Sequence, residues 1–288
     1  MPKNQNIWYI FVDSPSGAIT RYPILEIITS ISGIEKVYET GSRPMRLYGS
    51  DFKHYIAKFG KPHDLLNELI AARFCALWDI RVPPSAFIRI LPEHLPAGFD
   101  KRRFEQLGFG SEYLEYAQEF TNFILTWKNS DYDIGRIVNR GDFLRIGLFD
   151  LWLANDDRNY NNPNLLIQPQ NDGFYLVAID HVNIFNGNAL PRGLYHESKE
   201  SSILCSPYMP LLFRINDKFK NMLNLLVLEF EELVEECRKA LPSLLQEVPP
   251  EWGIDIAQQE EQMRQLFTAE WIGGTINHFR LYIAQNFW

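Results

Sequence analysis

The stretch from Leu148 to His181 places carboxylates and carboxamides at the ends of apolar segments. An apolar run that ends at Ala154 is followed by the letters NDDRNYNNPN, which we call the acidic loop (residues 155–164). The carboxylates and carboxamides that stand at the edges of the apolar segments are Asp156, Asp157, Asn162, Asn164 and Asp180. Oxygen ligands of this kind suit Mg²⁺ and phosphate chemistry better than a soft metal. Asn and Asp also collect in loops because their side chains cap turns, so residue types alone leave two interpretations.

The order of the segments favours the chemical interpretation. Two short apolar runs, 165–167 and 174–179, are joined by the turn-forming residues 169–173, a pattern typical of a β-hairpin. Such a hairpin would return Asp180 to the neighbourhood of the acidic loop. The segments follow one another in the order that phosphoryl-transfer enzymes need: a helix, an acidic loop, a strand, a turn, a strand and a final Asp.

A second group of residues lies earlier in the chain. Lys58 stands in the apolar segment Tyr-Ile-Ala-Lys-Phe, and the predicted helix 63–78 that follows contains Glu68 as the only acid inside its body. A lysine on such a strand usually extends its charged end to solvent. The alternative is a lysine that points into a cleft, where it binds the α- and β-phosphates and is held by a carboxylate of the next helix.

One turn before Lys58 combines small residues with a cation. Gly41, Ser42 and Arg43 separate the predicted strands 34–39 and 45–48. Backbone N–H groups in such a turn can cradle phosphates, and Arg43 could add a charge-assisted hydrogen bond. The other interpretation is an ordinary turn between two strands.

Together these motifs resemble those of the protein-kinase-like superfamily. More narrowly, they resemble the HipA-like kinases and, more distantly, the phosphatidylinositol kinases. The family's D-R-H-x-x-N type loop is matched by the residues that begin at Asp157-Arg158-Asn159, and its later I-D element by Ile179-Asp180. The resemblance extends from about residue 34 to the end. The sequence departs from the pattern at Asn159, where many relatives have His.

The resemblance implies roles for four of these residues. Asp157 would be the catalytic base and Asp180 the principal metal ligand. Lys58 would neutralise charge on the α- and β-phosphates, and Glu68 would orient it.

A second metal ligand would come from one of two asparagines. Asn162 has the usual spacing from Asp157, whereas Asn164 has the usual position directly before the Leu-Leu-Ile strand. Both remain candidates.

The cofactors implied are ATP and Mg²⁺. The nucleotide would contact the turn at Gly41, Ser42 and Arg43. Its adenine would bind the backbone of a hinge at 117–121, which includes Ala117 and Glu119.

The surrounding pattern predicts an α+β, bilobal protein-kinase-like fold. The N-lobe, residues 1–118, would contain an antiparallel sheet and one helix after an N-terminal hairpin extension, and the C-lobe, 119–288, would be mostly helical. We expect a short helix at 24–31, an exposed insertion at 92–109 and a helix at 143–154 that is apolar on nearly every face and therefore buried. The remaining expected elements are the strands 54–59 and 86–91, a hinge-proximal strand from 111, and the helices 217–239, 257–271 and 275–286.

Composition excludes several classes of protein. The net charge is −8 and no block of Lys and Arg occurs, which argues against binding of nucleic acid or an anionic membrane. Three scattered cysteines without metal spacing indicate reduced thiols of a cytoplasmic protein. The first residues lack a signal sequence, and no apolar run is long enough to cross a bilayer.

The expected function is ATP- and Mg²⁺-dependent phosphoryl transfer, with Ser or Thr of a protein substrate as acceptor. Three alternatives stay open: a small-molecule kinase of the same fold, a nucleotide-binding pseudokinase that acts as an interaction module, and transfer of AMP. If the chain is a toxin, as the resemblance allows, a separate antitoxin or regulatory chain would bind DNA, because no helix-turn-helix with a basic face is visible here.

Overall fold

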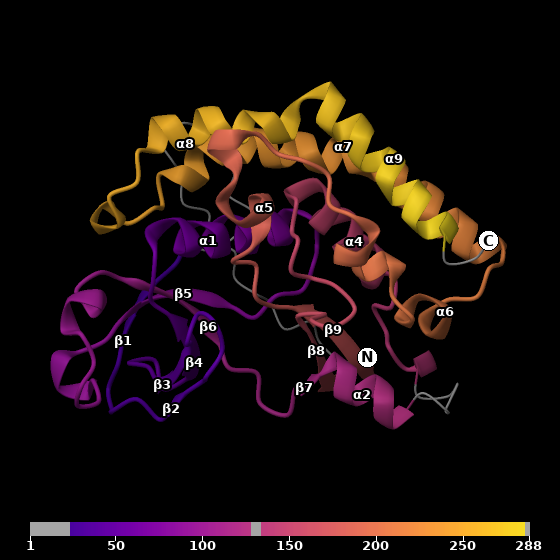
Figure 1. Cartoon of the computed structure of the whole chain (residues 1–288). Coiled ribbons are helices and arrows are strands. Elements are labelled where there is room, and N and C mark those ends of the chain that lie inside the picture. The colour runs from indigo at the N-terminus through magenta and orange to yellow at the C-terminus, as the bar shows by residue number, and fades with distance from the viewer. Residues whose placement is uncertain (1–23, 128–133, 286–288) are drawn as a thin grey trace, which may run out of the picture.

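The fold is α+β, with a six-stranded sheet in the N-terminal part and a mostly helical C-terminal part (Figure 1). The computed structural model describes residues 24–127 and 134–285. The N-terminal hairpin predicted at 7–22 lies outside these residues. In the described part, no helix is both long and apolar enough to cross a membrane.

The N-terminal sheet has the strand order β1-β5-β6-β4-β3-β2. The meander β2–β3–β4, which forms one end of the sheet, is antiparallel as predicted, with Met45 opposite Ala57. Alternate residues of β4 are buried, so that one face of the strand covers the core and the other is free for chemistry. The strands are β1 (Ile27–Thr29), β2 (Lys36–Val37), β3 (Met45–Tyr48), β4 (His54–Lys58), β5 (Ser85–Arg89) and β6 (Gly108–Glu112).

Two predictions for this part were wrong in detail. The segment 24–31 is not a helix but contains β1, which pairs in parallel with β5 and makes the sheet mixed. The β-branched residues Ile27, Ile28 and Thr29 prefer the extended backbone, and Ile28 is buried when they adopt it. The segment 92–109 is only partly exposed, because Phe104 is buried and β6 already begins at Gly108.

Helix α1 (Pro62–Leu77) lies between the sheet and the C-terminal helices (Figure 1). Pro62 occupies the first turn, where its missing N–H costs nothing. Most of the helix is buried, including the polar side chains of Asn67 and Glu68. Burial of these two polar groups requires partners: Asn67 finds them in the C-terminal part, and Glu68 pairs with Lys58 of β4.

The C-terminal part surrounds the predicted hairpin, which is confirmed. Strands β8 (Leu165–Gln170) and β9 (Gly173–Ala178) pair in antiparallel register, and β7 (Gln118–Glu119) adds to the β8 edge. At the turn, Gly173 has φ +151, and a Cβ there would lie 2.5 Å from the carbonyl oxygen of Arg136.

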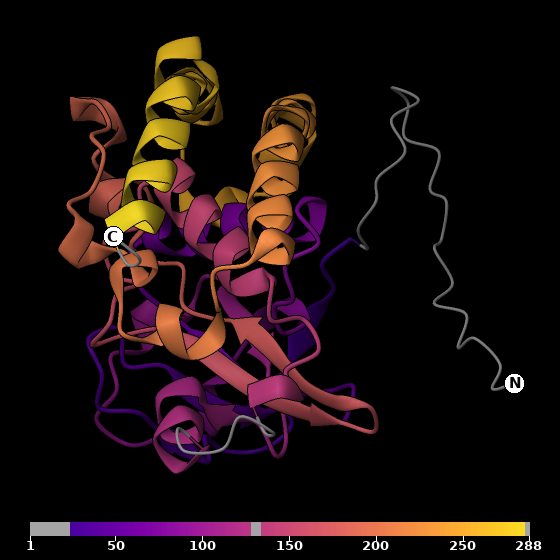
Figure 2. The ribbon, with the colours of Figure 1, turned by 90° about the vertical axis from the view of Figure 1, so that its right-hand side faces the viewer.

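Helices α7 (Asp217–Leu245), α8 (Ile256–Met263) and α9 (Ala269–Gln285) form a layer on the side of α1 away from the six-stranded sheet (Figures 1 and 2). As predicted, α4 (Asp142–Leu153) is buried on nearly every side. The other helices are α2 (Phe120–Trp127), α5 (Ile184–Asn188) and α6 (Tyr208–Leu212). Short 3₁₀ turns are Pro92–His94, Lys101–Phe104, Leu190–Arg192, Lys199–Ser201, Ile203–Cys205, Pro250–Trp252 and Arg264–Phe267.

The boundary between the last two helices differs from the prediction. α8 ends at Met263, and α9 begins at Ala269 and continues through Gly273-Gly274. Gly274 serves packing here, because a Cβ at this position would lie 2.3 Å from Nε2 of His196. Gly274 therefore admits a neighbouring side chain, and the helix continues through it.

Candidate active site

The ammonium of Lys58 lies between two carboxylates from distant parts of the chain. Its Nζ donates a hydrogen bond to Oε1 of Glu68 on α1 and another, of 2.7 Å, to Oδ1 of Asp180 after β9. The side chains of Lys58 and Glu68 are 14% and 6% exposed, whereas that of Asp180 is 35% exposed. Lys58 therefore faces a cleft and not bulk solvent, and the predicted ion pair with Glu68 is present.

The burial of this cluster shifts each pKa. Burial lowers the pKa of Lys58, but the attraction of Glu68 and Asp180 outweighs it and leaves the pKa above its ordinary value. Burial raises the pKa of Glu68, and the Lys58 ammonium opposes this. Burial also acts to raise the pKa of Asp180, yet Lys58 holds it below the usual range. At neutral pH, Lys58 is thus cationic and Asp180 anionic, as charge compensation of a phosphate and a metal ion requires.

The backbone conformation at the end of the hairpin orients the side chain of Asp180. The N–H of Ile179 donates to the carbonyl of Asn164 over 3.0 Å, which ties the end of β9 to the start of β8. Asp180 itself has φ +56, a left-handed conformation that Asp tolerates better than most residues. This turn directs its carboxylate back toward Lys58.

The acidic loop brings Asp157 and Asn164 together. Nδ2 of Asn164 donates to Oδ2 of Asp157 over 3.1 Å, and the positive φ of Asn164 places its side chain on the inner side of the loop. Asn162 is exposed, and its backbone N–H donates to Oδ1 of Asn159 over 3.3 Å. Of the two asparagines left open by the sequence, Asn164 is the one beside Asp157.

Asn159, the departure from the family pattern, shapes this loop. Its Oδ1 accepts the backbone N–H groups of Asn161 (2.9 Å) and Asn162 (3.3 Å), and its Nδ2 donates to the carbonyl of Asp157 (3.2 Å). The side chain thus closes a turn on the solvent side of the loop, as Asn commonly does. In this chain the position supports the loop conformation.

Arg158 is the residue of the site that sequence reasoning overlooked. It is fully buried and forms an ion pair with Asp150 of α4, with Nε 2.8 Å from Oδ2. Its Nη1 donates to the carbonyls of Pro163 (3.3 Å) and Asn164. One guanidinium therefore joins the C-terminal end of the acidic loop to the buried helix. The available signal was Asp150, one of the few charged residues in a mostly apolar helix.

Helix α1 also holds the segment that follows Asp180. Nδ2 of Asn67 donates to the carbonyl of Val182 (2.8 Å) and to Oδ1 of Asn188 (3.0 Å), whose own Nδ2 donates to Asp64 (3.0 Å). His181 is buried, and burial together with Arg158 lowers its pKa well below the ordinary value. His181 is therefore neutral at pH 7.

A cavity of about 480 Å³ connects the small-residue turn to Lys58. Its lining includes Gly41, Ser42, Arg43 and Lys58 on one side and Val182 on the other. The turn is closed by a hydrogen bond of 2.9 Å from the N–H of Arg43 to the carbonyl of Thr40.

Two further cations, Lys61 and Arg103, line the same cavity and were not predicted from sequence. Arg103 is anchored there by a hydrogen bond of 2.9 Å from its Nε to the carbonyl of Phe59.

The two predicted hinge residues lie along the connection between the sheets. Ala117 is half-buried and its N–H donates to the carbonyl of Leu114 (3.3 Å). Glu119 is opposite Leu166 in the β7–β8 ladder, and its exposed side chain accepts from Asn122 (3.0 Å). Neither residue lines the 480 Å³ cavity. Because both residues lie beside β8, the group that could contact an adenine is their backbone and not their side chains.

The donor set suits a hard cation. Asp180 offers a carboxylate, and Asn164 retains its amide oxygen because its nitrogen is the group bound to Asp157. Within 24–127 and 134–285, no group of three or more His, Cys, Asp or Glu side chains is arranged so that it could hold a metal ion.

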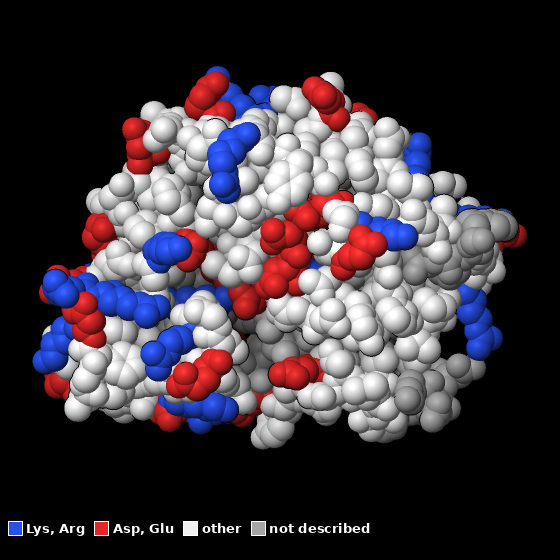
Figure 3. All heavy atoms as spheres, viewed as in Figure 1, with Lys and Arg blue, Asp and Glu red and all other residues white. Residues whose placement is uncertain are grey.

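Acidic side chains border the entrance to the site. In Figure 3, Asp and Glu side chains gather along the central hollow, whereas Lys and Arg are frequent over the six-stranded sheet. Burial and the neighbouring Asp157 raise the pKa of Asp156. Burial also raises the pKa of Glu197, and the negative charge of Asp156 adds to this rise.

Comparisons with known proteins identify the family and a similar fold. A family profile described as HipA-like kinase matches residues 29–288. Among solved structures, the chain is similar to the proinflammatory kinase CtkA of Helicobacter pylori, with a TM-score of 0.51 and 14% sequence identity over 90% of this chain and 99% of that one. At this identity, the similarity concerns the fold alone. No curated protein matches the sequence.

Proposed function

Because this chain belongs to the HipA-like kinase family, we propose that it transfers the γ-phosphate of ATP, with Mg²⁺, to a Ser or Thr hydroxyl of a protein. The family assignment makes the chain a kinase, and hence a phosphotransferase that uses a nucleotide and a divalent ion. The proposal of ATP- and Mg²⁺-dependent phosphoryl transfer rests on one observation: the ammonium of Lys58 contacts both Glu68 and Asp180.

Lys58 would bind the α- and β-phosphates in the 480 Å³ cavity. Glu68 keeps the ammonium in place, and the raised pKa keeps it charged. The backbone at Gly41 and Ser42, with Arg43, would hold the same phosphates from the other side. Positioning and charge compensation supply most of the catalysis in phosphoryl transfer.

Asp180 and Asn164 would hold Mg²⁺ through a carboxylate and an amide oxygen. The bound ion would neutralise negative charge on the phosphate oxygens. We favour Asn164 over Asn162 because Asn164 contacts Asp157 and its carbonyl is bonded to the residue before Asp180.

Asp157 would accept the proton of the attacking hydroxyl. Its Oδ2 is held by Asn164, and its backbone N–H donates to Oδ1 of Asn155 (3.3 Å). The first bond orients the carboxylate and the second holds the backbone beneath it, and a general base in this reaction requires such positioning. Adenine would meet the hinge backbone near Ala117 and Glu119.

The exposure of the acidic loop supports a protein as the acceptor. The 480 Å³ cavity ends at Val182 and is not lined by Asp157. Tyr160, Asn161 and Asn162, which follow Asp157, are exposed. A hydroxyl presented on the surface of another protein can approach such a loop, whereas a small molecule would lack enclosing walls.

Labelled ATP tests the proposal. The chain is incubated with Mg²⁺ and casein in the presence of γ-labelled or α-labelled ATP, and with Asp157→Asn in parallel. We expect label in protein from γ only, and loss of this label in the variant. Label from α would indicate AMP transfer. Label confined to small molecules would indicate a small-molecule kinase, and nucleotide binding without turnover a pseudokinase.

A further inference from the structure

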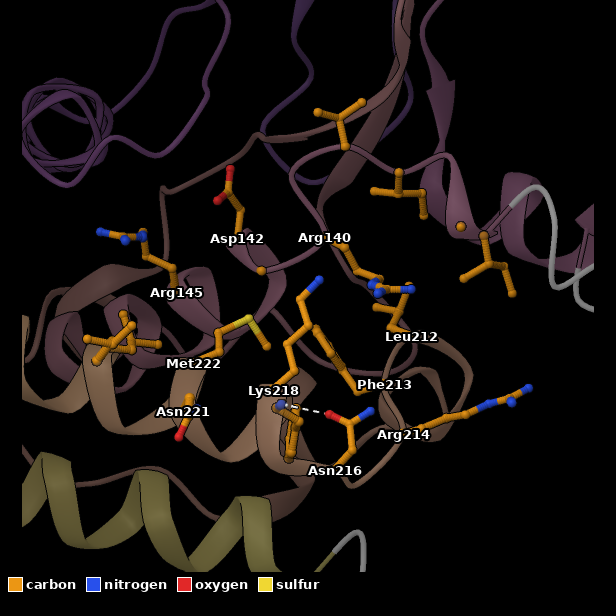
Figure 4. A pocket seen from close by; sticks show the side chains of 18 of the residues that line it. Arg140, Asp142, Arg145, Leu212, Phe213, Arg214, Asn216, Lys218, Asn221 and Met222 are labelled. Carbon is orange, nitrogen blue, oxygen red and sulfur yellow. Dashed lines mark hydrogen bonds between the residues drawn. The ribbon is translucent and has the colours of Figure 1, made fainter.

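A large cavity formed by described residues lies away from the candidate active site. It has a volume of about 1220 Å³ and runs between residues 134–145, which lead into α4, and residues 211–229, which lead through the first half of α7 (Figure 4). We call it the α4–α7 groove. None of its lining residues belongs to the cluster around Lys58 and Asp157. At this volume it exceeds the usual size of a small-molecule pocket.

The α4–α7 groove is cationic on a chain whose net charge is −8. Four cations line it, but only two acids, Asp142 and Glu229. Both acids have partners: Asp142 accepts from Nδ2 of Asn139 over 2.6 Å, and Glu229 pairs with Arg145 over 3.2 Å. The cations are Arg140, Arg145, Arg214 and Lys218.

Arg140 and Lys218 are the two cations that reach into the hollow (Figure 4). Within residues 24–127 and 134–285, neither side chain has an Asp or Glu at ion-pair distance. The guanidinium of Arg140 lies 5.9 Å from the centre of the Phe213 ring, which leaves its N–H groups available. Two positive side chains directed into one groove favour a negatively charged partner, because charges on the two sides of an interface are arranged to be complementary.

Apolar side chains stand beside these charges. Leu225 of α7 is 58% exposed, Val138 51% and Leu211 38%, and all three line the groove. A bound segment would therefore need apolar side chains as well as acids. Nucleic acid satisfies the charges but offers nothing to exposed leucines, whereas an acidic amphipathic peptide satisfies both.

We propose that the α4–α7 groove binds an acidic, amphipathic peptide segment of a partner protein. Its acids would pair with Arg140 and Lys218, and its apolar side chains would cover Leu225 and the residues around it. The chain's own first residues do not fit this description, because residues 1–23 contain a single acid, Asp13, against Lys3 and Arg21.

One wall of the groove also contacts the acidic loop. The hydroxyl of Tyr208, at the start of α6, donates to the carbonyl of Tyr160 over 3.2 Å, and the two rings lie 5.7 Å apart. Helix α6 then leads directly to Leu211. A protein held in the groove would thus lie against α6, which contacts the acidic loop through Tyr208, although its binding does not depend on the reaction proposed above.

A random peptide library displayed on phage tests the groove on the full chain. We expect selected peptides to be rich in Asp and Glu with interspersed Leu, Ile or Phe. Their Kd, measured by fluorescence anisotropy, should rise about 10-fold or more in the double variant Arg140→Glu/Lys218→Glu, because each reversed charge repels the peptide. The Kd should also rise with salt, since exposed charges are screened.

A matched control keeps the change of net charge the same. Lys101→Glu/Lys239→Glu reverses two exposed cations that do not line the groove, and peptide affinity should stay unchanged. Leu225→Ser should weaken binding without altering the salt dependence. If circular dichroism shows that the double Glu variant is unfolded, Arg140→Gln/Lys218→Gln replaces it.

Three outcomes would overturn the proposal. The first is a selection without acidic enrichment, and the second is equal peptide affinity for the groove variant and the control. The third is another occupant: light scattering that shows a dimer lost in the groove variant would assign the groove to a second copy. A single-stranded oligonucleotide bound through Arg140 and Lys218 while no acidic peptide is selected would assign it to nucleic acid.

Discussion

Nζ of Lys58 lies 2.7 Å from Oδ1 of Asp180, although the two residues are 122 positions apart in the chain. The contact joins the central strand of the N-terminal sheet to the end of the C-terminal hairpin. Glu68 completes it from α1, and Asn67, one residue earlier, holds the segment after Asp180. The N-terminal sheet, α1 and the C-terminal hairpin therefore meet directly at the candidate site.

Replacement of Lys58 by Met should abolish phosphoryl transfer. The methionine leaves Glu68 and Asp180 without a counter-charge and removes the cation that would meet the phosphates. We expect kcat/KM to fall about 100-fold or more, as for the loss of one preorganised electrostatic contact. Lys53→Met is the control, because Lys53 forms an exposed pair with Glu112 outside the cavity. Steady-state kinetics give the answer, and wild-type kcat/KM in Lys58→Met would refute the assignment.

The two asparagines of the acidic loop can be separated by paired glycine variants. Asn164 has φ +47, so glycine removes its amide without straining the backbone. We expect Asn164→Gly to raise the Mg²⁺ concentration needed for half-maximal activity and to lower kcat about 100-fold. Asn162→Gly, at an exposed position, should change either value less than threefold. The reverse pattern in a Mg²⁺ titration would make Asn162 the ligand.

The ion pair of Arg158 with Asp150 should dominate the stability of the acidic loop. Arg158→Leu leaves the Asp150 carboxylate buried with Asn155 as its remaining partner, and breaking a buried pair in this way typically costs about 3–5 kcal/mol. Asp150→Leu/Arg158→Leu should recover most of that free energy of unfolding in urea titrations, yet stay inactive because the Asn164 carbonyl is no longer held. A loss below about 1 kcal/mol in Arg158→Leu would contradict the prediction.

His196 should make the stability of the chain depend on pH in the acid range. Its ring stacks on Trp271 at 4.0 Å and on His278 at 4.4 Å. Burial and His278 lower its pKa from 6.5 to about 4. The unfolded chain therefore binds more protons between these values, so this contribution to stability is present above pH 6.5 and is lost as the pH falls toward 4.

The variant His196→Phe keeps a stacking ring but removes the titration. We expect its Tm to fall less than that of the wild type between pH 6.5 and 4, with carboxylates that titrate in the same range cancelling in the difference. Differential scanning calorimetry at several pH values measures this. Parallel Tm curves for the two proteins would show that His196 does not contribute.

Several features were predictable because they depend on short stretches of chain. The hairpin at 165–178 follows from alternating apolar runs around a turn, and the burial of α4 follows from apolar residues on nearly every face. Lys58 and Glu68 could be paired in advance because a strand and the helix directly after it lie close together. The helix expected at 24–31 failed for the complementary reason: β1 exists only because β5, about sixty residues later, offers it a partner.

By itself, the sequence determined which residues could do chemistry and in what order, because residue types and local periodicity are written along the chain. The tertiary structure alone decided that Asn164 and not Asn162 lies beside Asp157, that Arg158 joins the acidic loop to α4, and that Arg140 and Lys218 share one groove. The physical reason is that hydrogen bonds and ion pairs depend on distances of a few ångströms, and side chains separated along the chain reach such distances only through packing of the whole molecule.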